Sequence, residues 1–347
     1  MNRDLRSVIL LSAVVAIVGG ACGSTAASPT SASGGTTLAT SAVSAGSSAS
    51  TLHCQNGNPC SIGIVTFSAT DVAVNQVVKG AQKVASDNGW TSSVVDANGS
   101  PDAANSAIED YVQKKVDAVI VTVFPTDSLG AGLAATRAAG IPLLSEGGGL
   151  AAGVAISIDL AIGDVVASRL KKDLNGDGSV LALNYTGGLP CRLRYSSYQD
   201  MITATPGIKS TLQEVPVPGQ VEAGASATLA WLAAHPAGSG NLAVWACFDD
   251  PAMGAISAIK QTGRTGIKVY GFNGNPDALA AIRDGSMTAT LWLDDTGFGT
   301  QLAKAVPDII AAGPKWVPKV VAGTNILVDK SNLDQFLKDH PEQAPAS

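Results

Sequence analysis

Histidine, the commonest general base, is scarce in this sequence. Only three histidines occur, His53, His235 and His340, and none lies where a general base would be expected. The sequence contains neither a G-x-S-x-G nucleophile motif nor a G-x-x-x-x-G-K-[ST] phosphate loop. We therefore expect no enzyme, no catalytic residues and no cofactor.

A glycine-rich segment matches a loose dinucleotide-binding pattern, with Gly147, Gly149 and Ala152 in G-x-G-x-x-A order. The segment after it predicts a strand at 154–158, whereas a bound phosphate needs a helix N-terminus. This context favours a loop whose glycines let backbone approach a ligand or a chain crossover.

A second segment has the opening spacing of a calcium loop. Asp173, Asn175 and Asp177 stand at positions 1, 3 and 5, followed by Gly178. The twelfth position is Asn184 rather than the glutamate that binds calcium through both oxygens. A polar turn between a helix and a strand is favoured, and the three residues remain a weak calcium candidate.

The cysteines fit an oxidising compartment. Cys54 and Cys60 bracket a turn-rich segment, which predicts a local disulfide. Cys191 and Cys247 are either a second pair or two buried free thiols.

Composition predicts a folded protein of about two domains. The chain has 347 residues, of which 46% are hydrophobic, enough for a sizeable core. Only 14% are charged and the net charge is −6. The sequence shows no basic stripe of the kind that indicates nucleic-acid binding. No apolar run reaches the ~18 residues of a membrane-spanning helix.

The N-terminus predicts export. Arg3 and Arg6 precede an apolar stretch at 8–18, too short to span a membrane. The following Gly-Gly-Ala-Cys resembles a bacterial lipobox, which implies a signal peptide at 1–21 and a diacylglycerol on Cys22. An ordinary signal with an incidental cysteine is the alternative. Residues 22–51 contain 26 Ser, Thr, Ala or Gly and no charge, so we expect a flexible tether to the outer face of the cytoplasmic membrane.

From residue 61 onward, predicted strands and helices alternate. This order predicts an α/β fold of two doubly wound parallel-sheet lobes, with ligands bound at the carboxyl ends of the strands in a cleft between them. The predicted strands are 62–65, 92–96, 118–123, 142–145, 154–158, 179–183, 242–246, 268–270 and 288–293. The predicted helices are 74–85, 101–112, one ending at 139, 162–170, 196–205, 221–234, 252–262 and 276–284.

Three segments together resemble one family. They are 62–65 leading to 78–82, Asp-Asp-Pro-Ala-Met-Gly-Ala at 249–255, and Val-Tyr-Gly-Phe-Asn-Gly at 269–274. The sequence resembles type I periplasmic solute-binding proteins over about 61–330, especially the ribose- and glucose/galactose-binding branch. The resemblance implies two lobes joined by a three-segment hinge. We place the N-terminal lobe at 52–157 plus 294–322 and the C-terminal lobe at 158–293 plus 323–347.

The resemblance also implies a set of ligand-binding residues. They are Asp71, Glu146, Gly147, Arg192 or Arg194, Phe248, Asp249, Asn273, Leu293 and Asp294. Several of them stand where sugar-binding members of the family have hydrogen-bonding side chains. The ligand therefore has fewer hydroxyl groups, or other side chains of the site make the missing hydrogen bonds. Other roles remain open for four of them: Asp71 as a helix cap, the arginines in surface pairs, Phe248 in the core and Asn273 in a turn.

The family likeness bears on the calcium and cysteine segments as well. The remaining calcium ligands of the glucose/galactose-binding protein fall at Leu181 and about Leu242, so the loop is a relic or a weak site. The loops of Cys191 and Cys247 edge the cleft side by side in the family, which makes a disulfide between them a hypothesis.

The predicted function is a lipid-anchored receptor that captures a small polar ligand, preferably a sugar or sugar-like compound, for an ABC permease. We expect a monomer that binds no nucleic acid. A receptor for a membrane signalling protein and an importer receptor for a non-sugar solute are the alternatives.

Overall fold

The computed structural model describes residues 52–54, 57–160 and 162–344. The predicted signal peptide at 1–21 and tether at 22–51 lie outside the described residues. Within those residues, no helix is both long and apolar enough to cross a membrane.

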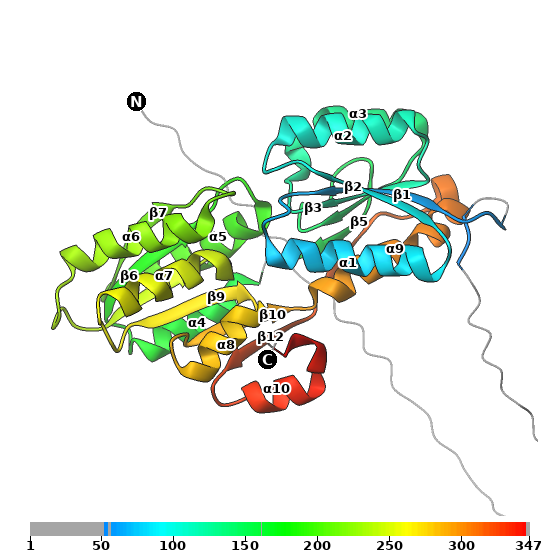
Figure 1. Cartoon of the computed structure of the whole chain (residues 1–347). Helices are drawn as coiled ribbons and strands as arrows, with labels where there is room; N and C mark the ends of the chain where they lie inside the picture. The colour runs from blue at the N-terminus through cyan, green and yellow to red at the C-terminus, as the bar shows by residue number, and fades with distance from the viewer. Residues whose placement is uncertain (1–51, 55–56, 161, 345–347) are drawn as a thin grey trace, which may run out of the picture. The chain divides into compact units, whose positions relative to one another are not determined.

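The first lobe is built on a parallel sheet with the strand order β11-β5-β4-β3-β1-β2. Helices α1 and α9 pack together on one face of this sheet, and α2 and α3 pack together on the other (Figure 1). The strands are β1 (Ser61–Thr66), β2 (Thr91–Asp96), β3 (Ala118–Thr122), β4 (Leu143–Glu146), β5 (Val154–Asp159) and β11 (Lys319–Ala322). The helices are α1 (Val72–Asp87), α2 (Pro101–Gln113), η2 (Thr126–Ser128), α3 (Gly130–Ala139), α9 (Asp295–Ala312) and η3 (Gly313–Lys315).

The second lobe is built on a sheet with the order β12-β10-β9-β8-β6-β7, parallel except for β12. Helix α6 packs on α7, and α4 packs on α5. The strands are β6 (Gly178–Asn184), β7 (Ile208–Glu214), β8 (Leu242–Ala246), β9 (Lys268–Asn273), β10 (Ala289–Leu293) and β12 (Asn325–Asp329). The helices are α4 (Gly163–Asp173), α5 (Leu189–Thr203), α6 (Gln220–Ala234), α7 (Asp249–Gln261), α8 (Pro276–Asp284), α10 (Leu333–Asp339) and η4 (Pro341–Gln343).

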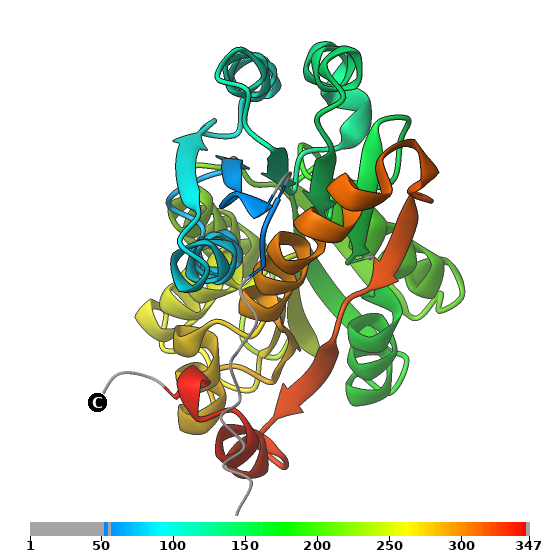
Figure 2. The ribbon, with the colours of Figure 1, turned by 90° about the vertical axis from the view of Figure 1, so that its right-hand side faces the viewer.

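The chain passes between the two sheets three times. It leaves the first sheet after β5, returns after β10, and leaves again between β11 and β12. Figure 2 shows β11 and β12 running one after the other from the first sheet to the second. Strand β5 stays in the first sheet as far as Asp159, two residues beyond the predicted lobe boundary at 157.

Local sequence explains where the main elements begin and how closely they pack. Ser100 caps α2 by accepting a hydrogen bond from the Ala103 N–H, and Pro101 occupies the first helical turn. Helices α1 and α9 come into backbone contact because Gly80 and Gly299 have no side chain. A Cβ at Gly80 would overlap the Thr296 carbonyl, and one at Gly299 would overlap the carbonyl of Val77.

The predicted α/β fold is confirmed, but three parts of the prediction were wrong or incomplete. Strand β7 was not predicted, because its only buried residue is Ile208 and the rest of this edge strand is exposed. Helix α5 begins at Leu189 rather than near Ser196, since its start is marked by Gly188 at the N-cap and Pro190 in the first turn rather than by an apolar period. No elements were predicted after Leu293, where α9, β11, β12 and α10 follow.

Candidate functional site

A cavity of about 50 Å³ lies between the two lobes, where the carboxyl ends of strands from both sheets meet. The first lobe supplies residues that end or follow β1, β3 and β4, and the second supplies residues that end or follow β6, β8 and β9. The lining residues are Phe67, Asp71, Ala73, Val74, Val123, Glu146, Leu160, Tyr185, Gly188, Pro190, Cys191, Arg194, Val217, Phe248, Asn273 and Asp295.

Aromatic rings form part of the wall and connect the two lobes. Phe67 lies 4.6 Å from Phe124, centroid to centroid, within the first lobe. It also meets Tyr185 of the second lobe edge to face, with the ring centroids 5.8 Å apart. Phe248 adds a third aromatic side chain, 7% exposed. Such rings offer apolar faces on which C–H groups of a small ligand can pack.

Three carboxyl groups reach the cavity from three different segments. Asp71 caps α1, and its Oδ1 accepts a hydrogen bond of 3.0 Å from the Val74 N–H. Glu146 ends β4 and is 3% exposed, and its Oε2 has no hydrogen-bond partner. Asp295 opens α9 and is also 3% exposed. An unpartnered buried oxygen is costly, so the cavity wall is prepared to accept hydrogen bonds from a ligand.

Arg194 is the buried cation of the cavity. One terminal N–H donates to the Cys247 carbonyl at 2.7 Å, and the guanidinium lies 4.8 Å from the centroid of Phe272. Its Nε has no hydrogen-bond partner. Among the described residues, no ion pair within 4.0 Å joins Arg194 to Asp71, Glu146 or Asp295. The guanidinium is therefore held by its own lobe and keeps a donor for a ligand.

Burial perturbs the ionisation of all four groups. Burial, reinforced by the nearby Asp71 carboxyl, raises the pKa of Glu146 to about 7. Burial also raises the pKa of Asp71, and it raises that of Asp295 well above its ordinary value. Burial lowers the pKa of Arg194 to about 10, against the attraction of the surrounding carboxyls. Clusters of perturbed groups in a cleft are typical of functional sites.

The structure brings five of the residues suggested by family resemblance to this cavity. They are Asp71, Glu146, Arg194, Phe248 and Asn273. Asp71 is also the cap of α1, so both roles proposed for it apply together. Asn273 adopts a left-handed backbone conformation with φ of 101° at the end of β9, which fits the turn role as well.

The other five lie outside the cavity lining. Gly147 lies close to Pro190 of the opposite lobe, where a Cβ on Gly147 would come within 2.8 Å of the proline ring. Arg192 lies at the surface with a nitrogen 3.9 Å from Asp127, which agrees with the surface-pair alternative. Leu293 is buried at the end of β10. Their positions give them no direct approach to a ligand in this conformation.

Asp249 and Asp294 have structural partners instead. Asp249 is fully buried, and its oxygens accept hydrogen bonds from the Asn275 N–H at 2.8 Å and the Thr290 hydroxyl at 2.7 Å. It thus ties the start of α7 to the loop after β9. Asp294 caps α9 by accepting a 2.9 Å hydrogen bond from the Gly297 N–H.

Several lining residues were missed, most importantly Asp295 and Tyr185. Asp295 follows Asp294 directly, so two adjacent acids after a predicted strand were the available signal. Which of them faces the cavity depends on the start of α9, an element that was not predicted. Tyr185 and Val217 carry no signal beyond their positions just after β6 and β7.

Both predicted cysteine pairs are at disulfide-bonding distance, with Cα separations of 5.0 Å for Cys54 and Cys60 and 5.2 Å for Cys191 and Cys247. The second pair lies at the cavity: Cys191 lines it, and the Cys247 carbonyl holds Arg194.

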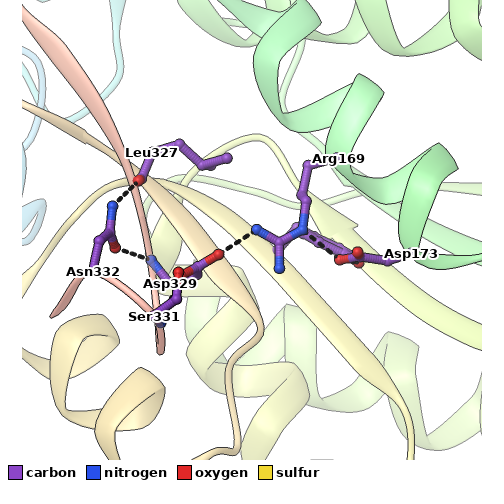
Figure 3. Close-up of polar contacts among 7 residues, drawn as sticks. Arg169, Asp173, Leu327, Asp329, Ser331 and Asn332 are labelled. Atoms are coloured by element: carbon purple, nitrogen blue, oxygen red, sulfur yellow. Dashed lines mark hydrogen bonds and ion pairs between the residues drawn. The ribbon is translucent and has the colours of Figure 1, made fainter.

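The segment with calcium-like spacing is engaged in protein contacts (Figure 3). The Asp173 carboxylate accepts hydrogen bonds of 2.8 Å from Arg169 Nε and from the Tyr270 hydroxyl. Arg169 also pairs with Asp329 of β12. In the described part of the chain, no three His, Cys, Asp or Glu side chains are grouped to hold a metal ion. The Arg169 guanidinium thus supplies positive charge beside Asp173.

We expect calcium removal to leave stability unchanged and Arg169→Ala to lower the free energy of unfolding by about 2 kcal/mol, since hydrogen bonds to charged groups contribute about 1.5–3 kcal/mol. Thermal melting with and without EDTA, and urea unfolding of the variant, measure both effects. Lys260→Ala removes an exposed pair with Asp284 and serves as the control, with a change below about 1 kcal/mol. A melting temperature that drops in EDTA and recovers with calcium would contradict this expectation.

Comparison with known proteins identifies the family. The sequence profile of the periplasmic binding protein domain matches residues 62–314, most of the chain. This chain belongs to the periplasmic binding protein family. Members are extracytoplasmic solute-binding components of transport systems, and they are not enzymes.

Individual relatives agree with this family. The chain is 26% identical over 266 residues to the ribose import binding protein RbsB of Bacillus subtilis, covering 74% of this chain and 83% of that protein. It is 29% identical over 199 residues to a xylitol-binding protein of Mycolicibacterium smegmatis, covering 56% of each. An ABC transporter solute-binding protein from Agrobacterium vitis, solved with allitol, superimposes with a TM-score of 0.75 at 24% identity, covering 81% of this chain and 98% of that one. This last likeness shows the fold.

Proposed function

We propose that this protein captures a sugar or polyol between its two lobes and delivers it to an ABC permease. The observation that carries the proposal is the cavity between the lobes, with unpartnered buried polar atoms on both sides: Glu146 Oε2 from the first lobe and Arg194 Nε from the second. Hydroxyl groups of a bound ligand would donate to the first and accept from the second. The ribose and xylitol named for the relatives are ligands of this chemistry.

The proposed contacts divide by chemistry. Asp71, Glu146, Asp295 and Asn273 supply polar atoms to ligand hydroxyls, and Arg194 donates from the opposite wall. The rings of Phe67, Tyr185 and Phe248 pack against its C–H surface. The cavity volume of about 50 Å³ holds about three or four water molecules, so a sugar enters only when the lobes move apart.

A thermal-shift screen of the purified protein tests the proposal. The panel contains ribose, xylitol, allitol, myo-inositol, glucose and galactose, with amino acids and nucleosides as comparison classes. A ligand that binds only the folded state adds about 2.7 kcal/mol of stability at 100 times its dissociation constant. A shift from a sugar or polyol supports the proposal. A shift from amino acids or nucleosides alone contradicts it.

We further propose that Cys22 carries a lipid anchor and that residues 22–51 tether a monomeric binding domain to the outer face of the cytoplasmic membrane. The extracytoplasmic role of the family supports this location. Replacing Cys22 with alanine should move the protein from the membrane fraction to the soluble fraction.

We also propose that both cysteine pairs form disulfides, and that the Cys191–Cys247 bond holds two cavity walls together. Intact mass after alkylation, with and without reductant, should show four protected thiols. Joint replacement of Cys191 and Cys247 by serine should weaken ligand binding by about 10-fold, because the Cys247 carbonyl positions Arg194. Joint replacement of Cys54 and Cys60 is the control, since neither cysteine lines the cavity. Two alkylated thiols at Cys191 and Cys247 without reductant would refute this bond.

A further inference from the structure

The charges facing the cavity do not balance. Three carboxyl side chains line it, Asp71, Glu146 and Asp295, against one cationic side chain, Arg194. Each carboxyl comes from a different segment: the loop before α1, the end of β4 and the start of α9. They therefore converge from three directions within one lobe, while the cation lies on α5 of the other.

The cation does not neutralise these acids directly. Arg194 gives its hydrogen bond to the Cys247 carbonyl and stacks on Phe272, and none of the three carboxyls is within ion-pair distance of it in the described structure. Independently of the acidic cluster, Glu146 Oε2 is an acceptor without a partner on a side chain that is 3% exposed. Asp295, equally buried, receives no hydrogen bond from any described residue.

A desolvated group of carboxyls favours a ligand that brings positive charge. Neutral hydroxyls would satisfy single acceptor atoms, whereas a cation placed among the carboxyls would also favour their ionised forms, which burial alone disfavours. An ammonium group has three N–H donors and forms the stronger, charge-assisted type of hydrogen bond with carboxylates. A ligand with a carboxylate would add a fourth acid to the cavity, so anionic solutes are disfavoured.

We propose that the ligand of this site is an amino sugar or aminopolyol, whose protonated amine lies among Asp71, Glu146 and Asp295. Its hydroxyls face Arg194 and Asn273 on the other side of the cavity. The inference rests on the proposed function, capture of a sugar-like ligand, and specifies the class of that ligand.

Isothermal titration at pH 7.5 with matched pairs tests this inference. D-glucosamine is compared with D-glucose, and D-glucamine with D-sorbitol, because each pair differs in one amine for one hydroxyl. Ribose and xylitol are titrated alongside as neutral references. We expect the amine of at least one pair to bind at least 10-fold more tightly than its neutral partner.

Variants identify which acids produce the preference. Asp295→Asn and Glu146→Gln should each reduce the amine-to-neutral affinity ratio by at least 5-fold. Asp308→Asn makes the same charge change on the exposed side of α9 and should leave the ratio unchanged. An amine-to-neutral affinity ratio that is unchanged in both cavity variants would show that these carboxyls do not bind the amine.

The outcomes separate this inference from the proposed function. If ribose, xylitol or another neutral member binds and the amines bind equally or more weakly, the inference is wrong and the proposed function stands. If neither neutral nor amine members bind to folded protein, the proposed function fails and the inference fails with it.

Discussion

Arg194→Ala is expected to weaken ligand binding by about 10- to 100-fold. The guanidinium is the only cationic side chain lining the described cavity, and its Nε, which has no protein partner, is the donor proposed for the ligand hydroxyls. A hydrogen bond to a charged group contributes about 1.5–3 kcal/mol, and about 2.7 kcal/mol corresponds to about 100-fold in affinity. Titration calorimetry with the ligand identified by thermal shift measures the loss.

Two arginine variants serve as controls for this prediction. Arg192→Ala removes a neighbouring cation on the same helix whose contact is at the surface with Asp127, and it should change affinity by less than about 2-fold. Arg194→Lys keeps a positive charge but loses the planar guanidinium, so its loss of affinity should lie between those of Arg192→Ala and Arg194→Ala. Equal losses for Arg192→Ala and Arg194→Ala would show that Arg194 has no specific contact with the ligand. Circular dichroism confirms that each variant is folded.

The protein should become less stable as pH rises from about 5 to 8, and Glu146 should account for part of this loss. Its pKa is about 7 in the folded protein against an ordinary value of 4.5, because burial and the Asp71 carboxyl favour the neutral form. The folded state therefore binds this proton more tightly than the unfolded chain. The stabilisation is complete below about pH 4.5 and is lost as pH rises through about 7. At about 1.4 kcal/mol per pKa unit, the ceiling for Glu146 is about 3 kcal/mol.

Urea unfolding at several pH values, in the absence of ligand, measures this dependence. Glu146→Gln is neutral at every pH, so its free energy of unfolding should decline less than that of the unmodified protein. The slope should not vanish, since burial also raises the pKa of four other carboxyls: Asp71, Asp249, Asp250 and Asp295. Glu222→Gln, at an exposed position on α6, should retain the full slope. Identical slopes for Glu146→Gln and the unmodified protein would contradict the burial argument.

The elements that the sequence predicts best are those whose own residues determine their environment. Strand β3 consists of five buried residues, Ala118–Thr122, so its composition reveals it. Strand β7 exposes almost every side chain. Its pairing with β6 depends on the tertiary structure and leaves no pattern in its own sequence. The start of α5 was similarly hidden, because its first turn has no apolar period, although Pro190 and Cys191 there line the cavity.

The cavity-lining residues could be predicted where the family resemblance supplied their positions. They could not be predicted where the first residue of a helix determines which side chain faces the cavity. Asp71 and Arg194 were found through the likeness of the surrounding segments. Asp294 and Asp295 show the limit: the first caps α9 and the second faces the cavity, and only the starting point of the helix distinguishes them. The same limit separates Arg192 from Arg194, two positions apart on one helix, of which one is at the surface and one is 3% exposed.

The three passages of the chain between the sheets have a consequence for synthesis. The first lobe takes its helix α9 and its edge strand β11 from residues 295–322, which the ribosome makes after most of the second lobe. A nascent chain ending at Leu293 would contain five strands of the first sheet but would leave the α9 side of α1 uncovered. A late stop codon would therefore remove part of the first lobe, although most of that lobe is encoded first. The first lobe can complete its fold only after α9 and β11 have been synthesised.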